Sequence, residues 1–192
     1  MERRFSSTTV GLETRDNGKP LIVGYAAVFH RDGDAGTEYQ LFPGLVERIA
    51  PTAFTRSVVE DQDDIRALIN HDDGCILGRT SAGTCKVTVD ARGLRYEIDP
   101  PDTQYARDVM VSIARGDISG SSFGFNARKD SIQPGEDYDI RLLEDVKLFD
   151  VGPVVSPAYT AASTGIRSAA DTEDVYAKWQ KWQAVQARLK EL

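Results

Sequence analysis

The sequence predicts a mainly β domain of the α+β class with at least two helices. Short runs rich in β-branched and aromatic residues recur between turn signals over residues 20–160. The period becomes helical over residues 101–115 and again near the C-terminus. We therefore expect an N-terminal extension (1–19), a β domain (20–160), a linker (161–171) and a C-terminal amphipathic helix (172–192).

Composition is typical of a folded domain. Of the 192 residues, 41% are hydrophobic and 28% are charged, which suits a chain that buries a substantial core. No apolar run approaches the roughly 18 residues that cross a bilayer, and the N-terminus lacks the apolar segment of a secretory signal. A net charge of −7 argues against phosphate-backbone binding. We expect neither a membrane nor a nucleic acid as partner.

The first half of the domain alternates strands with one helix. Apolar runs predict strands over residues 21–29, 47–50 and 65–71, and Gly24 marks a bulge or a close backbone contact. A helix is expected to begin at Pro51 or Thr52 and to reach residue 59. The strand over residues 65–71 would deliver His71 to the start of a loop. Residues 85–90 and 94–98 predict a hairpin around residues 91–93.

The second half begins with a helix over residues 101–115, with Asp102 or Thr103 as N-cap and Gly116 as stop. Strands are expected over residues 121–127, 138–143 and 146–155, with a polar loop over residues 129–137. The C-terminal helix carries an apolar stripe that could dock on the core, pair with a second copy or tether the chain to a partner.

Two adjacent serines stand within a glycine-flanked stretch. Residues 120–124 match G-x-S-x-G, but the nucleophile elbow of α/β-hydrolases needs a following helix and a later histidine, and both are missing here. Alternation instead places Ser122 opposite Phe123 and Phe125, so that Ser122 faces a cleft while Ser121 points into the core. The pair could also serve only to let two backbones pass closely.

A serine nucleophile requires a base and a group that orients the base. His71 is the better of two candidate bases, because His30 lies in a charged turn; His71 could instead cap its strand end. Asp150 and, as the alternative, Glu144 are the candidate acids, because regular alternation places both on one face of a strand.

Metal binding is the rival at these positions. His71, Cys75 and Cys85, with Asp72 or Asp73, could bind zinc, but their spacing matches no standard pattern. Both cysteines are expected to be free thiols. The chain contains neither of the glycine-rich phosphate-binding motifs, and we expect no metal and no cofactor.

Several stretches together resemble the prohead (capsid maturation) proteases of tailed bacteriophages. They occur in the order of that family across residues 20–167: Gly24-Tyr25-Ala26-Ala27-Val28-Phe29, Ile49-Ala50-Pro51-Thr52-Ala53-Phe54, Leu68-Ile69-Asn70-His71-Asp72, Leu77-Gly78-Arg79-Thr80, Gly93-Leu94, residues 115–125, Asp150-Val151-Gly152-Pro153-Val154 and Pro157-Ala158-Tyr159. Each piece is weak alone, and the ordered set is specific.

The resemblance implies a serine protease related to the herpesvirus assemblins, with a closed or nearly closed β-barrel and helices packed outside it. By motif, Ser122 resembles the nucleophile, His71 the base and Asp150 the third member. This chain departs from the family at Gly152, where serine is usual, and at Asp150, where glutamate is common. Backbone N–H groups near Ser156 to Ala158 are the expected oxyanion donors.

The resemblance also implies a substrate and a place of action. The enzyme would cleave scaffold or the scaffolding segment of the major capsid protein, and itself, inside the immature capsid in the host cell cytoplasm. A homodimer is compatible with that role. The rival functions are a noncatalytic capsid-assembly module with the same fold and a cytoplasmic esterase.

Overall fold

The structure is a computed structural model that describes residues 1–6, 10–155 and 169–189. Two α-helices, two short helical turns and eleven strands make up these residues. The helical elements are α1 (Gln104–Arg115), α2 (Ala169–Leu189), η1 (Ala35–Thr37) and the π-helical turn η2 (Arg56–Glu60). The strands are β1 (Glu2–Ser6), β2 (Gly11–Thr14), β3 (Pro20–Val28), β4 (Tyr39–Phe42), β5 (Leu45–Ile49), β6 (Arg66–Leu68), β7 (Ile76–Arg79), β8 (Cys85–Val89), β9 (Gly93–Ile98), β10 (Gly120–Gln133) and β11 (Asp139–Val154).

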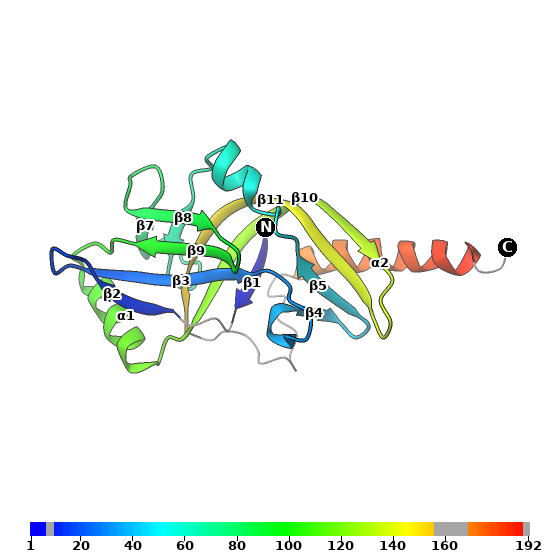
Figure 1. The fold of residues 1–192 in the computed structure, drawn as a ribbon, viewed down its shortest axis with the longest axis horizontal. Coiled ribbons are helices and arrows are strands. Elements are labelled where there is room, and N and C mark those ends of the chain that lie inside the picture. Colours follow the sequence, from blue (N-terminus) through cyan, green and yellow to red (C-terminus); the bar gives the residue numbers. More distant parts are fainter. Residues whose placement is uncertain (7–9, 156–168, 190–192) are drawn as a thin grey trace.

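The strands form two sheets (Figure 1). The larger sheet has the order β1-β10-β11-β5-β4, and β6 joins it by pairing with β11 and with β7. The smaller sheet has the order β2-β3-β9-β8. Neighbouring strands pair antiparallel except where β5 and β6 run parallel to β11. The long β10–β11 hairpin is therefore the central element of the larger sheet.

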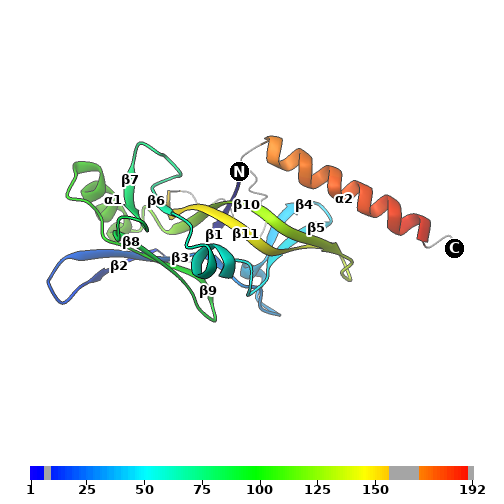
Figure 2. The ribbon, with the colours of Figure 1, turned by 90° about the horizontal axis from the view of Figure 1, so that it is seen from above.

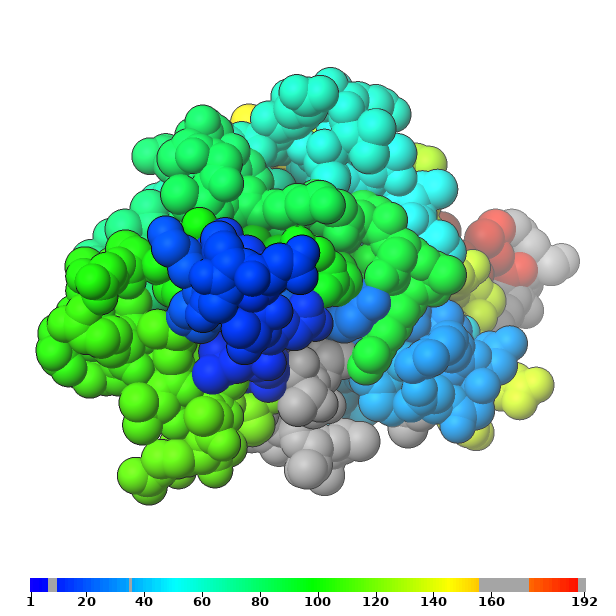
Figure 3. All heavy atoms as spheres, turned by 60° about the vertical axis from the view of Figure 1, so that its left-hand side comes forward, coloured from blue at the N-terminus to red at the C-terminus, as the bar shows by residue number. Residues whose placement is uncertain are grey.

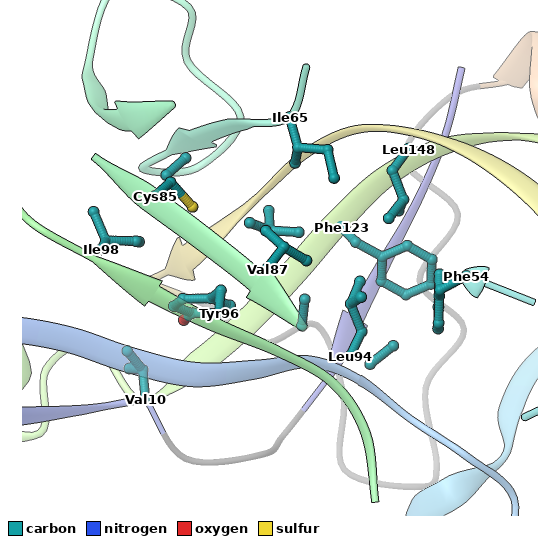
Figure 4. Close-up of a cluster of buried hydrophobic side chains, with 14 of the residues drawn as sticks. Val10, Phe54, Ile65, Cys85, Val87, Leu94, Tyr96, Ile98, Phe123 and Leu148 are labelled. Carbon is teal, nitrogen blue, oxygen red and sulfur yellow. The ribbon is translucent and has the colours of Figure 1, made fainter. Parts of the chain in front are cut away.

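A hydrophobic core lies between the two sheets (Figure 4). From the larger sheet, Phe123 and Phe125 enter it as a stacked pair with ring centroids 5.0 Å apart. From the smaller sheet, Leu94 and Tyr96 of β9 meet them, and each of these four side chains is fully buried. Burial of apolar side chains from both sheets holds the layers together.

The predicted barrel is wrong, because within the described residues no sheet closes on itself. The path of the larger sheet ends at β1 and β4, and the smaller sheet ends at β2 and β8. Closure would require these edge strands to pair with one another. The core is instead enclosed by face-to-face packing of two open sheets, as in a sandwich.

Residues 1–19, assigned above to an N-terminal extension, contribute a strand to each sheet. Strand β1 pairs with β10, and β2 pairs with β3. The space-filling view in Figure 3 shows the β2–β3 hairpin (blue) beside the atoms of β8, β9 and α1 (green). The sequence boundary at residue 20 thus divides strands that pair with each other.

Most other predicted elements are present with shifted ends. The β8–β9 hairpin and the strand β3 are confirmed, and α1 begins after Thr103 and ends at Gly116, as expected. The predicted loop over residues 129–137 is too long, because β10 continues to Gln133. Polar side chains of that stretch, including Asp130, bond to charged partners on β11 while the backbone remains in the ladder.

Helix α2 docks on the β4–β5 hairpin through its N-terminal half. Val175 and Trp179 pack with Leu41 and Leu45, and the Trp179 indole donates a 2.6 Å hydrogen bond to Asp139. The C-terminal half projects past the β10–β11 hairpin (Figures 1 and 2). Of the three expected arrangements, the structure thus shows contact with the chain's own β domain, through a smaller apolar cluster than the core between the sheets. It begins at Ala169, and residues 161–168 of the predicted linker lie outside the described residues.

Candidate active site

His71 stands on a strained turn after β6. Asn70 and His71 both have positive φ angles, 53° and 59°, which non-glycine residues rarely adopt. The end of β11 holds this turn: the Asn70 N–H donates to the Pro153 carbonyl at 3.1 Å, and the Asn70 side chain accepts from the Val155 N–H at 3.0 Å. These bonds fix the imidazole, whose side chain is only 3% exposed, beside β10 and β11.

Ser122 lies on β10 with its hydroxyl hydrogen-bonded to His71 Nε2. The neighbouring Ser121 points the other way, into the core, and its hydroxyl is 2.8 Å from that of Tyr96. The expected alternation of the two serines is thus present. Ser122 is nevertheless fully buried, so the expectation that it faces an open cleft is wrong. Strand β1 lies beside it, and Ser122 donates a 2.8 Å hydrogen bond to the Arg4 carbonyl.

Asp150 is the third member of a hydrogen-bonded row formed by Ser122, His71 and Asp150, because its carboxylate is hydrogen-bonded to His71 Nδ1. Its position depends on a β-bulge: Gly124 pairs with Asp150 and the next residue, Phe125, pairs with Leu148, so Phe149 is the extra residue. Directly paired residues share a face of a sheet. Leu148 therefore faces the core while Asp150 faces His71. The regular alternation from which Asp150 and Glu144 were expected on one face is therefore interrupted between Leu148 and Asp150.

Two glycines leave room for the row. A Cβ on Gly124 would lie 2.6 Å from an Asp150 carboxylate oxygen, and a Cβ on Gly152 would lie 2.0 Å from the Leu68 carbonyl oxygen. The first contact would displace the Asp150 carboxylate, and the second would displace the backbone of β6. The departure at Gly152 from the serine usual in the resembled family thus suits a close approach of β6 to β11.

The alternative residues lie elsewhere. Glu144 pairs with Lys129, whose hydrogen bond lowers the pKa of that carboxyl, and it makes no described bond to His71. His30 bonds to Asp32 in an exposed turn. The expected oxyanion donors, Ser156 to Ala158, lie outside the described residues.

The zinc alternative finds no support in the described part of the chain. Both cysteines are free, and Cys85 is buried in the core, where burial raises the pKa of its thiol to about 12. No three side chains of His, Cys, Asp or Glu come together there in an arrangement suited to a metal ion. Among the same residues, no helix is long and apolar enough to cross a membrane.

Strand β1 also contributes to this site, which the sequence did not predict. Phe5 pairs with Ser122 and packs edge-on against the His71 ring, with centroids 5.8 Å apart. Its neighbour Arg4 turns to the opposite face, where it bonds to the buried Glu47. The sequence carries no strand signal here, because residues 2–4 are all charged and Phe5 is the one apolar residue of residues 2–6. Without alternation of apolar and polar residues the pattern does not predict a strand.

Together these side chains form a row in which a carboxylate orients an imidazole and the imidazole contacts a hydroxyl. Such a row can take a proton from the hydroxyl as it attacks an acyl carbon. A comparison with protein families matches residues 8–175 to a model described as caudovirus prohead serine protease. Searches of curated proteins and of solved structures found no significant match.

Proposed function

The chain belongs to the caudovirus prohead serine proteases, and on that premise we propose that it cleaves scaffold or the scaffolding segment of the major capsid protein, and itself, during capsid maturation. The place of action would be the immature capsid inside the host cell. The observation that carries the proposal is the hydrogen-bonded row Ser122, His71 and Asp150.

Each member of the row has one role in the proposed mechanism. Asp150 accepts a hydrogen bond from His71 Nδ1–H, which leaves the Nε2 lone pair directed at Ser122. Ser122 Oγ attacks the carbonyl carbon of the scissile peptide, and Nε2 takes the hydroxyl proton. The imidazolium that forms is stabilised by the Asp150 carboxylate, which keeps its charge.

The second half of the reaction reverses the proton movement. His71 gives its Nε2 proton to the leaving amine, and the acyl group stays on Ser122 as an ester. A water molecule, deprotonated by the same nitrogen, then attacks the ester carbon, and Nε2 returns the proton to Ser122 Oγ as the ester C–O bond breaks. The burial of Asp150 and His71 favours this exchange, because charge interactions are stronger where water is excluded.

Co-expression with the capsid precursor tests the proposal. Ser122→Ala should abolish processing of the precursor, as measured by mass spectrometry of its fragments. Ser81→Ala is the matched control, because Ser81 is an exposed serine between β7 and β8, and processing should continue. Unchanged processing by Ser122→Ala would instead indicate the noncatalytic assembly module. Turnover of a small activated ester with an intact precursor would indicate the esterase.

A further inference from the structure

Strand β1 occupies the edge of β10 at the residue that we propose as nucleophile. The two strands are antiparallel over five residue pairs, from Glu2 opposite Phe125 to Ser6 opposite Ser121. Phe5 stands directly opposite Ser122. Peptide recognition often adds a strand to a sheet edge in this way, with backbone hydrogen bonds for affinity and alternate side chains for specificity. Here a segment of the chain itself fills that edge.

The contact with β1 involves the Ser122 hydroxyl proton, which His71 must accept during catalysis. A serine hydroxyl has one proton, and a backbone carbonyl can only accept it. The Arg4 carbonyl, 2.8 Å from the Ser122 hydroxyl, therefore competes with His71 Nε2 for that proton. The Arg4 oxygen, not its carbonyl carbon, is the atom bonded to Ser122. β1 thus lies beside the nucleophile as a hydrogen-bond acceptor.

The side chain of Phe5 adds a steric block. Its ring meets the His71 ring at 88°, and together with the Arg4 carbonyl it covers the hydroxyl and the imidazole. Ser122 is fully buried and the His71 side chain is 3% exposed. A substrate carbonyl must reach within about 3–3.5 Å of the attacking oxygen. With β1 in place, the Arg4 carbonyl oxygen already lies 2.8 Å from the Ser122 oxygen, and the Phe5 ring lies against the His71 ring.

Strand β1 can separate from β10 without leaving an unpaired buried charge behind. Arg4 bonds to Glu47, and Glu2 bonds to Arg141. Glu47 and Arg141 also bond to each other, at 2.7 Å. Departure of β1 removes one cation and one anion and leaves Glu47 and Arg141 paired. An unpaired buried charge, which would be costly, does not result.

We propose that β1 is a self-inhibitory strand, and that proteolysis requires its displacement from β10 by an extended segment of the substrate. That segment would place a large apolar side chain where Phe5 now packs on His71. The proposal rests on the function proposed above, because it assigns β1 the place of the substrate.

The test compares the rate at which a fluorophosphonate probe labels the active-site serine. Two variants weaken the block: a chain that lacks residues 1–6, and Phe5→Ala in the full chain. We expect labelling to accelerate at least about tenfold without residues 1–6, since both obstacles go, and severalfold in Phe5→Ala. Leu12→Ala is the matched control, because Leu12 is a large apolar residue on β2 with 38% exposure; its rate should equal that of the wild type.

A synthetic peptide of residues 1–6 provides the reverse experiment. Added to the shortened chain, it should slow labelling in proportion to its occupancy of β10. Equal labelling rates of the wild type and both variants would overturn the proposal, and Phe5→Ala decides it alone where the shortened chain fails to fold. Labelling of no form at all would overturn the assignment of Ser122 itself, and this proposal with it.

Discussion

The two ends of the β10–β11 hairpin bury polar groups in different ways. At the end near Gly120, Ser122 and Asp150 form with His71 a row whose proton can move between partners. At the other end, Arg141 lies between Glu2, Glu47 and Asp130 as part of a network of permanent charges. Burial opposes ionisation of Arg141, but Glu47, Glu2 and Asp130 outweigh it and raise its pKa above the usual value.

One end of the hairpin is thus suited to catalysis, and the other end is suited to anchoring β1 through ion pairs. A row that contains an imidazole can change its charge during a reaction, whereas an arginine stays protonated at any working pH. Strand β1 joins the two ends, because Arg4 enters the charge network with its side chain and contacts Ser122 with its carbonyl. Substitutions at one end should therefore change activity, and those at the other should change stability.

The largest expected effect follows from His71→Ala. Loss of the base should lower turnover by about 10⁴- to 10⁶-fold, as much as Ser122→Ala, because members of such a row act as a unit. Steady-state cleavage of a peptide from the capsid precursor measures it. His30→Ala, which removes the other histidine, should leave turnover within about twofold. Retained activity in His71→Ala would place the chemistry elsewhere.

At the anchoring end, Glu47→Ala should destabilise the fold by about 3–5 kcal/mol, because Arg4 and Arg141 would lose the fully buried one of the two carboxylates that they share. Urea unfolding at neutral pH measures the change. Glu60→Ala, at an exposed position, is the control and should stay within about 0.5 kcal/mol. Similar stabilities for the two variants would show that the network contributes little.

Gly124→Ala tests whether the position of Asp150 matters. A methyl group there would meet the Asp150 carboxylate and turn it away from His71. We expect kcat to fall about 100-fold, since small misplacements of a catalytic group have effects of that size. Gly11→Ala has open space around the new methyl and should retain full activity. Full activity in both variants would argue that Asp150 need not be held where it lies.

The smallest expected effect is on the stability of the fold at acidic pH. Burial opposes ionisation of Glu2, but Arg141 and Arg4 outweigh it and lower the pKa of its carboxyl. A lowered pKa in the folded state means that the stabilisation is present above the unfolded value of about 4.3 and is lost as pH falls through the folded value. Urea unfolding between pH 5 and pH 3 should show a smaller loss of stability for Glu2→Gln than for the wild type. Parallel curves would contradict this linkage.

Much of the site follows from local pattern in the sequence. The alternation through Phe125 distinguishes Ser122 from Ser121, and with only two histidines His71 is readily identified. The acid could be narrowed only to Asp150 or Glu144. A bulge at Phe149 decides which face Asp150 occupies, and bulges depend on the pairing of two distant strands.

The sequence predicts the fold class, but it does not predict whether the sheets close into a barrel. Mainly β structure with two helices follows from the periods of the sequence, whereas the choice between a barrel and two packed sheets depends on whether edge strands pair. Strand β1 escaped prediction for a related reason. Its residues are mostly charged, and Arg4 and Glu2 can be buried only because they pair with Glu47 and Arg141 on other strands.

The central claim is that Ser122 is the nucleophile, activated by His71. Fluorophosphonate labelling followed by peptide mass spectrometry tests it most directly, in the full chain and in the chain lacking residues 1–6. The account predicts one modified residue, Ser122, and loss of that modification in His71→Ala. Modification of Ser121 or another serine, or labelling of Ser122 that persists in His71→Ala, would contradict it.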